Sequence, residues 1–361
     1  MHTFWLLLAA CGNDYELKPG PVDVNPGDVT ACGFTRVEDS AFYRYDCNPV
    51  FSVAATGDSW AGDIGSVAFA VTEVLDHPFY QAWYVGAPSA SDYGDYGIGY
   101  AVSPNGTDWD SHPANPLLQE PAASAWDGDM MDALQVVWDP ETAQYVMLYQ
   151  GFNIDLGRWG MGVATSSDGV GWAKLPSNPV VDFTESAGMG WCWPLGLSLG
   201  SVAGFTGYAA GARGSTSGND ACELYRINAS NVNDWQPDSE RVMAAGASGQ
   251  WDDEGFLSVA VEELDNQRYL FYAGFGGWEE HGTYRSTKNQ FFGYAIEEGD
   301  GWVRRGQIPL HMTAGGEVSA VAARRVGGRI HLWVTDVYEG TSAIGYFLFD
   351  PVAAAAEDST L

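Results

Sequence analysis

A strand-like pattern recurs five times along the chain, and this repeat constrains the fold more than any other feature. Its central phrase is rich in aromatic and branched residues and occurs at 80–86, 145–151, 205–211, 269–274 and 330–336. A second strand-like phrase follows each copy at 97–103, 160–166, 221–227, 291–296 and 343–349. Repetition at a period of roughly 60 residues is typical of architectures in which each unit packs against its neighbours. The sequence therefore predicts five copies of one structural unit.

Each copy contains two further strands. An alternating apolar stretch precedes the central phrase at 66–71, 133–137, 195–199, 258–263 and 318–323, and a turn ending in tryptophan follows the second phrase in four copies. Asn-Gly and Asp-Gly in these turns suit the positive φ angles of tight hairpins, so we interpret the turns as structural. Four strands in meander order, with the first innermost, form a propeller blade. The predicted fold class is all-β, a five-bladed β-propeller of four-stranded antiparallel blades.

The two ends of the repeat predict how the ring closes. The fifth unit stops after its third strand at Phe349, whereas residues 34–51 are strand-like and precede any first strand. The phrase Asn48-Pro49-Val50 recurs after the turn of two other units, at 115–117 and 178–180. We therefore expect the N-terminal segment to supply the outer strand of the last blade and so leave no blade with an unpaired edge.

Composition sets the domain boundaries. With 46% hydrophobic and 14% aromatic residues the chain can bury a large core, so the propeller is expected to span residues 34–352. Residues 12–33 are rich in Pro, Gly and Asp and are expected to form a flexible linker, and 353–361 a disordered tail. A net charge of −31 with 16 Lys and Arg would repel phosphate backbones, which excludes nucleic acid as a partner. We interpret the acidity as a solvated, salt-adapted surface, with binding of a cation or a cationic partner as the alternative. We expect a monomer.

The N-terminus predicts an attachment to the cell envelope. The apolar run from Phe4 ends in Leu8-Ala9-Ala10-Cys11, which resembles the lipobox of bacterial lipoproteins. This resemblance implies a signal over residues 1–11, lipidation of Cys11 and a location in the outer membrane or periplasm, with secretion as an alternative. No Lys or Arg precedes the run, so an ordinary signal or a different start is a second alternative.

Cysteine parity fits an oxidising compartment. Without Cys11, four cysteines remain, an even number that favours disulfides. Three pairings are open, and we favour the two that are local in sequence: Cys32 with Cys47, and Cys192 with Cys222.

Candidate site residues lie in the loops that enter the inner strands and in those that join the second and third strands, because both sets emerge on one face of a propeller. Four of the five entry segments carry carboxylates, and this face also carries aromatic, Arg and His side chains suited to sugars. The acids are Asp63, Asp127, Asp129, Asp132, Asp252, Asp253, Glu254 and Glu317, and the others are Arg158, Trp159, Trp193, Arg213, Trp278 and His281. Convergent carboxylates can protonate a leaving oxygen and activate water, as glycosidic cleavage requires.

Each of these residues also has a structural interpretation. An aspartate before a glycine often only caps its own turn. Trp126 and Trp251 recur in register with Trp60 and Trp191, which favours packing over ligand binding. His331 lies within a predicted strand and is expected to be an interior histidine.

The run 126–151, followed by 160–181, resembles the repeat of the five-bladed propeller glycosidases, which include arabinanases, β-xylosidases, invertase-like fructosidases and mannoside phosphorylases. The resemblance implies a base or nucleophile Asp entering the first blade, a second Asp in the second blade and an acid Glu in the third. Asp63 and Asp132 fill the first two places. In the third, Cys192 stands two residues before Pro194 where the acid is expected. Glu185 lies upstream and Glu254 belongs to the fourth unit, so either the acid has moved, with Glu254 as the candidate, or the activity has been lost.

The sequence thus predicts a glycan-processing hydrolase that uses Asp63, Asp132 and Glu254, with a carbohydrate substrate. The alternatives are a non-catalytic propeller that binds glycan or protein, and a purely structural envelope lipoprotein. No cofactor is expected, because the DGDMMD segment lacks the spacing of an EF-hand and no His and Cys cluster indicates zinc. The resemblance leaves calcium open, since members of the family sometimes hold a cation in the funnel.

Overall fold

The protein's structure is a computed structural model, and it describes the chain from Cys32 to Pro351 with gaps. The described residues are 32–38, 40–52, 60–61, 63–74, 77–87, 96–119, 124–153, 155–183, 189–190, 195–199, 204–213, 221–280, 285–287, 290–299, 301–308, 318–338 and 341–351. The chain divides into a first unit, Met1–Cys32, and a second unit, Gly33–Leu361, which contains all the strands below. Across the described residues, no helix has the length and apolar character needed to cross a membrane. The predicted signal, Cys11 and the tail 353–361 lie outside them.

In the part of the chain that the structure describes, the strands form five blade sheets, one for each predicted unit, and a sixth, two-stranded sheet. Blade 1 contains β4 (Asp63–Val74), β5 (His77–Ala87), β6 (Gly97–Ser103), β7 (Asp110–Ser111) and β8 (Leu118–Gln119). Blade 2 contains β9 (Met130–Asp139), β10 (Gln144–Asn153), β11 (Arg158–Ser166), β12 (Ala173–Lys174) and β13 (Val181–Asp182). Blade 3 contains β14 (Met189–Gly190), β15 (Leu195–Leu199), β16 (Phe205–Arg213), β17 (Glu223–Ala229) and β18 (Trp235–Met243).

Blade 4 contains β19 (Gly255–Leu264), β20 (Gln267–Phe275), β23 (Gln290–Glu298) and β24 (Gly301–Ile308). Its longest loop, between β20 and β23, contains a separate two-stranded sheet of β21 (Trp278–Glu280) and β22 (Arg285–Thr287). Blade 5 contains β25 (Ala320–Val326), β26 (Arg329–Tyr338) and β27 (Thr341–Phe349), joined by the N-terminal strands β1 (Phe34–Arg36), β2 (Phe42–Tyr45) and β3 (Phe51–Ser52).

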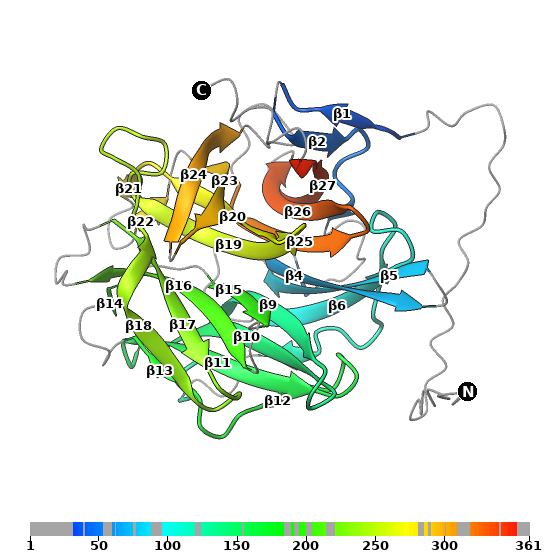
Figure 1. The fold of residues 1–361 in the computed structure, drawn as a ribbon. Helices are drawn as coiled ribbons and strands as arrows, with labels where there is room; N and C mark the ends of the chain where they lie inside the picture. The colour runs from blue at the N-terminus through cyan, green and yellow to red at the C-terminus, as the bar shows by residue number, and fades with distance from the viewer. Residues whose placement is uncertain are drawn as a thin grey trace. The chain divides into compact units, whose positions relative to one another are not determined.

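The first strands of the five blades surround a common axis (Figure 1). Contacts run from β4 to β9, β15, β19 and β25 and back to β4. The buried hydrophobic residues form five clusters, and each cluster combines side chains from two neighbouring blades. The chain is therefore the predicted five-bladed β-propeller, stabilised mainly by burial of apolar surface between blades.

The predicted closure of the ring is confirmed. In blade 5 the strand order is β1-β2-β27-β26-β25, so the N-terminal β2 pairs with the last strand of the chain. Figure 1 shows β1 and β2, in blue, beside the red β27. The indole of Trp333 in blade 5 also donates a hydrogen bond to the Gly106 carbonyl in a turn of blade 1. These contacts join the two ends of the repeat.

The recurring Asn-Pro phrase has a structural explanation. In three blades the asparagine side chain donates to a carbonyl of the third strand and accepts from an amide of the same residue, as a paired strand would. The pairs are Asn48 with Tyr346, Asn115 with Tyr100, and Asn178 with Val163. All three asparagines precede a cis proline. These side chains continue the pairing where the outer strands of blades 1 and 2 are only two residues long.

The turns ending in tryptophan are structural, as predicted. Trp109 donates its indole N–H to the Gly106 carbonyl, and Trp172 donates to that of Gly169. Trp83 of blade 1 also donates to Gly169, so this turn joins two blades. His331 lies within β26, as predicted, and is half-buried: its ring bonds Tyr346, and burial lowers its pKa to about 4.

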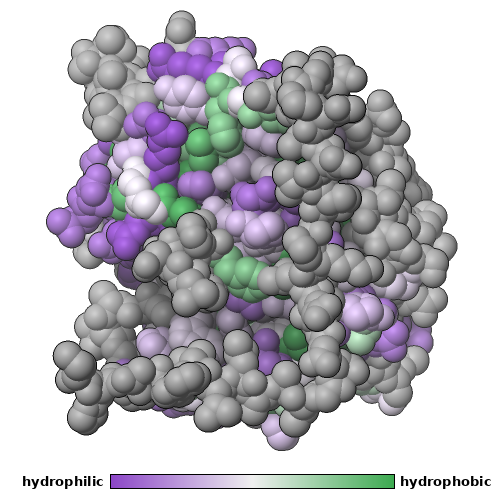
Figure 2. Space-filling view, turned by 90° about the vertical axis from the view of Figure 1, so that its right-hand side faces the viewer, coloured by the Kyte–Doolittle hydropathy of each residue, from purple (hydrophilic) through white to green (hydrophobic). Residues whose placement is uncertain are grey.

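Large hydrophobic side chains are mostly enclosed. Among the described residues those exposed at the surface are Phe34, Trp138, Leu156 and Val303. On the face drawn in Figure 2, purple and pale residues cover most of the coloured surface, and green hydrophobic residues form small groups. The hydrophobic content of the sequence is thus used between the blades.

Candidate functional site

The entry segments of blades 2 and 4 begin with the same aromatic contact. Trp126 stacks on Tyr149 with ring centroids 5.9 Å apart, and Trp251 stacks on Tyr272 at 5.3 Å. Trp60 stacks on Tyr84 of blade 1 at 5.8 Å in the same way. The packing interpretation of Trp126 and Trp251 is therefore confirmed.

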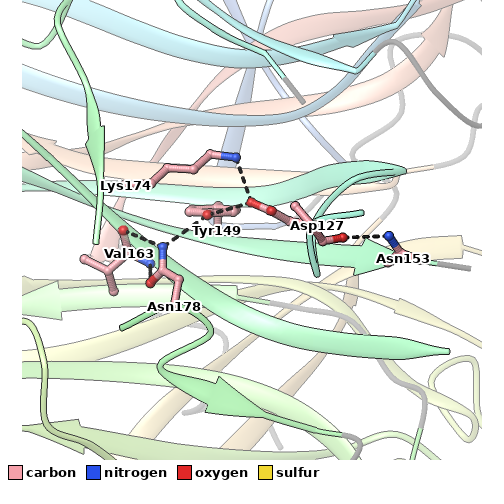
Figure 3. A network of polar contacts seen from close by, with 7 residues as sticks. Asp127, Tyr149, Asn153, Val163, Lys174 and Asn178 are labelled. Atoms are coloured by element: carbon pink, nitrogen blue, oxygen red, sulfur yellow. Dashed lines mark hydrogen bonds and ion pairs between the residues drawn. The ribbon is translucent and has the colours of Figure 1, made fainter. Parts of the chain in front are cut away.

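The aspartate after each of these two tryptophans is part of a buried ion pair. Asp127 accepts hydrogen bonds from Lys174 Nζ at 2.7 Å and from the Tyr149 hydroxyl at 2.9 Å (Figure 3). Its side chain is 3% exposed, and that of Lys174 is 23% exposed. Burial raises the pKa of the Tyr149 hydroxyl, and the charge of Asp127 raises it further.

Asp252 repeats this arrangement in blade 4. It accepts from Arg304 Nε at 2.7 Å and from the Tyr272 hydroxyl at 3.1 Å, and its side chain is 2% exposed. Of the entry acids, Asp127 and Asp252 are thus committed to contacts inside their own blades. Asp253 caps its own turn by accepting from the Gly249 amide at 2.7 Å. These three acids follow the structural alternative rather than converging on a ligand.

Three inner strands contain a β-bulge just after the entry segment. The register shifts between Ile64 and Val67 in β4, opposite Leu148 and Gln150 in β9, and between Phe256 and Ser258 in β19. In β9 the bulge places Ala133 at φ 49°. A bulge changes the direction in which neighbouring side chains point, and bulges are common beside active sites.

The register relates Asp63 to Asp132. Ile64, Met131 and Phe256 each pair with a glycine of the second strand, which marks the same position in three blades. Asp63 precedes this position by one residue, and Asp132 follows it by one. The two acids therefore lie on neighbouring inner strands and are two residues apart when counted from this shared position. The backbone thus brings them close together at the mouth of the propeller, by which we mean the end where the entry segments lie. The side chain of Asp63 lies outside the described residues.

Asp132 is half-buried and lies at the bulge of β9. Its Oδ1 accepts a hydrogen bond from the Ala133 amide at 2.6 Å. This contact is local, in contrast to the ion pair that holds Asp127 in the same segment. The predicted second acid thus lies at the irregular start of the inner strand of blade 2.

The remaining predicted residues of blade 2 lie together at the same end. Trp159 lies against Phe152 with ring centroids 3.9 Å apart, and Arg158 pairs with Asp182. The Asp129 amide donates to the Phe152 carbonyl at 3.0 Å. Asp129, Arg158 and Trp159 are thus brought together by β10 and its neighbours.

Asn153, which the sequence did not single out, links these loops. It is fully buried; its Nδ2 donates to the Ala125 carbonyl at 2.6 Å, and its Oδ1 accepts from the Leu156 amide at 2.9 Å. Ala125 begins the entry segment, and Leu156 lies in the loop before Arg158. One side chain, labelled in Figure 3, therefore couples the entry segment that carries the acids to the loop that leads into Arg158 and Trp159 of β11.

Glu254 lies at the seam between blades 4 and 3. Its carbonyl accepts from the Cys222 amide at 2.8 Å, and its amide donates to the Phe275 carbonyl at 3.2 Å. Cys222 also forms a parallel bridge with Gly255. The entry of blade 4 is thus joined to blade 3, the blade in which the family resemblance implies a catalytic acid.

The other predicted residues are described only in part or not at all. Arg213 ends β16 and Trp278 begins β21, but their side chains lie outside the described residues. Trp193, His281, Glu317 and Cys192 lie outside them entirely. Among the described residues, no group of three His, Cys, Asp or Glu could hold a metal ion.

The disulfide prediction is supported where it is described. Cys32, Cys47 and Cys222 are disulfide-bonded.

The sequence contained a signal that separates structural from candidate acids. Lys174 and Arg304 each stand two residues after the tryptophan of their turn, Trp172 or Trp302. Both occupy the same register position on the outer strand, opposite Ala164 and Ala295. An entry Trp-Asp followed later by Trp-x-Lys or Trp-x-Arg thus indicates an internal ion pair.

Comparison with known proteins identifies the fold. No protein-family model matches the sequence, and a search of curated proteins finds no match. Among solved structures, a β-1,2-mannobiose phosphorylase from Listeria innocua superposes with a TM-score of 0.62 at 10% identity, over 89% of this chain and 99% of that one. The chain shares the five-bladed β-propeller fold of glycoside hydrolases.

Two further neighbours show how varied the chemistry on this fold is. An N-acetylgalactosamine deacetylase from F. plautii, in complex with blood group B trisaccharide, has a TM-score of 0.61 at 13% identity, over 82% of this chain and 92% of that one. A glycosyl hydrolase from Bacteroides ovatus has a TM-score of 0.57 at 14% identity, over 89% and 94%. The reaction therefore has to be argued from the site and not from the fold.

Proposed function

We propose that this protein is a glycan-processing enzyme that hydrolyses a glycosidic bond at the mouth of the propeller. The observation that carries the proposal is the division of the blade 2 acids. Asp127 is used in a buried ion pair, whereas Asp132 lies at the β-bulge of the inner strand. The neighbouring blade presents Asp63 two register positions away.

Each acid has a role in this proposal. Asp63 is the base or nucleophile, and Asp132 orients it and adjusts its pKa. Glu254 is the acid that protonates the leaving oxygen, and its place at the blade 3 seam supports this assignment because blade 3 itself offers Cys192 instead of an acid. Trp159, backed by Phe152, offers a face on which a pyranose ring can stack.

A screen of the purified protein against plant and microbial oligosaccharides tests the proposal. On any glycan that is cleaved, Asp63→Asn and Glu254→Gln should each lower kcat/KM by roughly 10² to 10⁴-fold, the usual contribution of a general acid or base. Glu141→Gln is the matched control, because this exposed acid lies in the turn at the opposite end of β9. Cleavage that is unchanged by Asp63→Asn would refute the assignment.

A second candidate function is non-catalytic glycan binding. Cys192 at the place of the expected acid favours it, as does the use of Asp127 and Asp252 in ion pairs. Calorimetric titration with oligosaccharides distinguishes the two. Binding without any product, equally strong in wild type and Asp63→Asn, would support the binding protein.

We also propose that Cys11 is lipidated and anchors the protein in the cell envelope. Metabolic labelling with an alkyne fatty acid, followed by membrane fractionation, tests this. Cys11→Ser should lose the label and leave the membrane fraction, and a labelled Cys11→Ser protein would contradict the proposal.

A further inference from the structure

The inner strand of each blade has one edge that faces the channel instead of another strand. Backbone groups on such an edge require partners from elsewhere. Two of these backbone groups are bonded by a side chain of another blade. The Val321 amide of β25 donates to Ser258 Oγ of β19 at 3.1 Å, and Arg324 Nη2 of β25 donates to the Val136 carbonyl of β9 at 2.8 Å.

Arg324 reaches across the channel. β4 stands between β25 and β9 in the ring, so the guanidinium passes this strand to reach Val136. Its Nη1 also donates to the Ala323 carbonyl at 2.6 Å and lies 3.5 Å from Glu262 Oε1 of β19. Burial lowers the pKa of Arg324 and raises that of Glu262, and each charge opposes the shift of the other. The guanidinium, whose side chain is 16% exposed, therefore joins three inner strands.

The two partner residues have matching positions relative to the candidate acids. Val136 follows Asp132 by four residues, and Ser258 follows Glu254 by four residues. β25 is thus connected through Arg324 to the strand that carries Asp132, and through Ser258 to the strand that follows Glu254.

We infer that β25 is a spacer that sets the distance between Asp132 and Glu254 across the mouth, with Arg324 and Ser258 as its positioning residues. The inference rests on the proposed function. The separation of acids across a glycosidase funnel decides whether a water fits between them, and so whether the second acid attacks the sugar or activates water. A displacement of about 1 Å can lower a rate by on the order of a hundredfold.

The test uses the full-length protein and three variants. Arg324→Met combined with Glu262→Gln removes the bond to Val136 without leaving a buried charge. Ser258→Ala removes the second connection. Arg325→Met is the matched control, because Arg325 is adjacent and exposed. If the double variant does not fold, Arg324→Lys takes its place, since it keeps the charge but loses the guanidinium's paired donors.

Kinetics on a cleaved glycan and crystal structures of each variant provide the readouts. We expect kcat to fall at least tenfold in the Arg324 and Ser258 variants with little change in KM, together with an altered Cα separation of Asp132 and Glu254. Arg325→Met should match wild type. An unchanged separation and an unchanged kcat would overturn the inference. If wild type cleaves no glycan, the proposed function fails, whereas the crystal structures still decide whether β25 is a spacer.

Discussion

Blade 1 and blade 2 pack their entry segments in the same way but differ in the residues that follow the tryptophan. Both stack an entry tryptophan on a tyrosine of the second strand, Trp60 on Tyr84 and Trp126 on Tyr149. In blade 2 the next residue is Asp127, paired with Lys174. In blade 1 the same places hold Ala61 and Ser111, with Ser111 opposite Ala101 as Lys174 is opposite Ala164.

In these blades the acid and the cation occur together or not at all. Blade 4 has both, in Asp252 and Arg304, and blade 1 has neither. A buried carboxylate without its partner is costly, so single loss is disfavoured. Blade 3 continues the pattern in sequence, because Cys192 follows Trp191 and Pro237 stands two after Trp235. An acid after an entry tryptophan is therefore structural, and candidate catalytic acids must be sought further along the segment.

The largest effect is expected when the carboxylate of one buried ion pair is removed. Asp127→Ala or Asp252→Ala should lower the free energy of unfolding by about 3 kcal/mol, near the lower end for buried pairs because both cations are partly exposed. Urea denaturation measures this, with Glu141→Gln as control. Asp127→Leu combined with Lys174→Met should lose less, and an equal loss would argue against the ion pair as the cause.

In blade 5 the contact between His331 and Tyr346 is uncharged, and low pH should weaken it by protonating the histidine. His331 is neutral when folded because its pKa is about 4, against an ordinary value of about 6.5. The unfolded chain binds this proton first, so the stabilisation is complete above about pH 6.5 and is lost as the pH falls through about 4, by up to about 3 kcal/mol. Thermal unfolding of wild type and His331→Gln from pH 4 to 8 should show a weaker acid dependence in the variant. Parallel pH curves would contradict the assignment.

In blades 1, 2 and 4 an entry tryptophan stacks on a tyrosine, and this packing can be tested at the glycine that lies against the tryptophan ring. A Cβ on Gly151 would overlap the Trp126 ring, whereas one on Gly328 meets nothing within 4 Å. Gly151→Ala should therefore destabilise by about 1 to 3 kcal/mol, as overpacking does, and Gly328→Ala should not. Chemical denaturation measures both. Equal stability of the two variants would show that Trp126 moves freely.

The smallest effect is expected from transferring the pair into blade 1. Ala61→Asp alone should destabilise, and adding Ser111→Lys should restore about 1 kcal/mol or more through the coupling of adjacent groups. A double-mutant cycle measures this coupling free energy. A coupling free energy of zero would mean that the side chains introduced at 61 and 111 do not meet as those of Asp127 and Lys174 do, although their backbone positions are equivalent.

The repeat predicted most of the fold because strand phrases and turn residues are local signals. It gave the five blades, the strand supplied by residues 34–51 and the packing role of Trp126. The acids were harder, because Asp127 and Lys174 are distant in sequence and meet only through the sheet register. Asn153 carried no signal at all: its role depends on the two loops that end beside it.

Asp127 and Asp132 lie five residues apart and have different proposed roles: Asp127 stabilises the blade, and Asp132 takes part in catalysis. The most direct test is Asp127→Asn and Asp132→Asn, prepared in parallel and measured for unfolding free energy and for turnover of a glycan that wild type cleaves. We predict that Asp127→Asn loses stability, whereas Asp132→Asn keeps its stability and loses activity. An Asp132→Asn protein that is fully active, or as unstable as Asp127→Asn, would contradict the account.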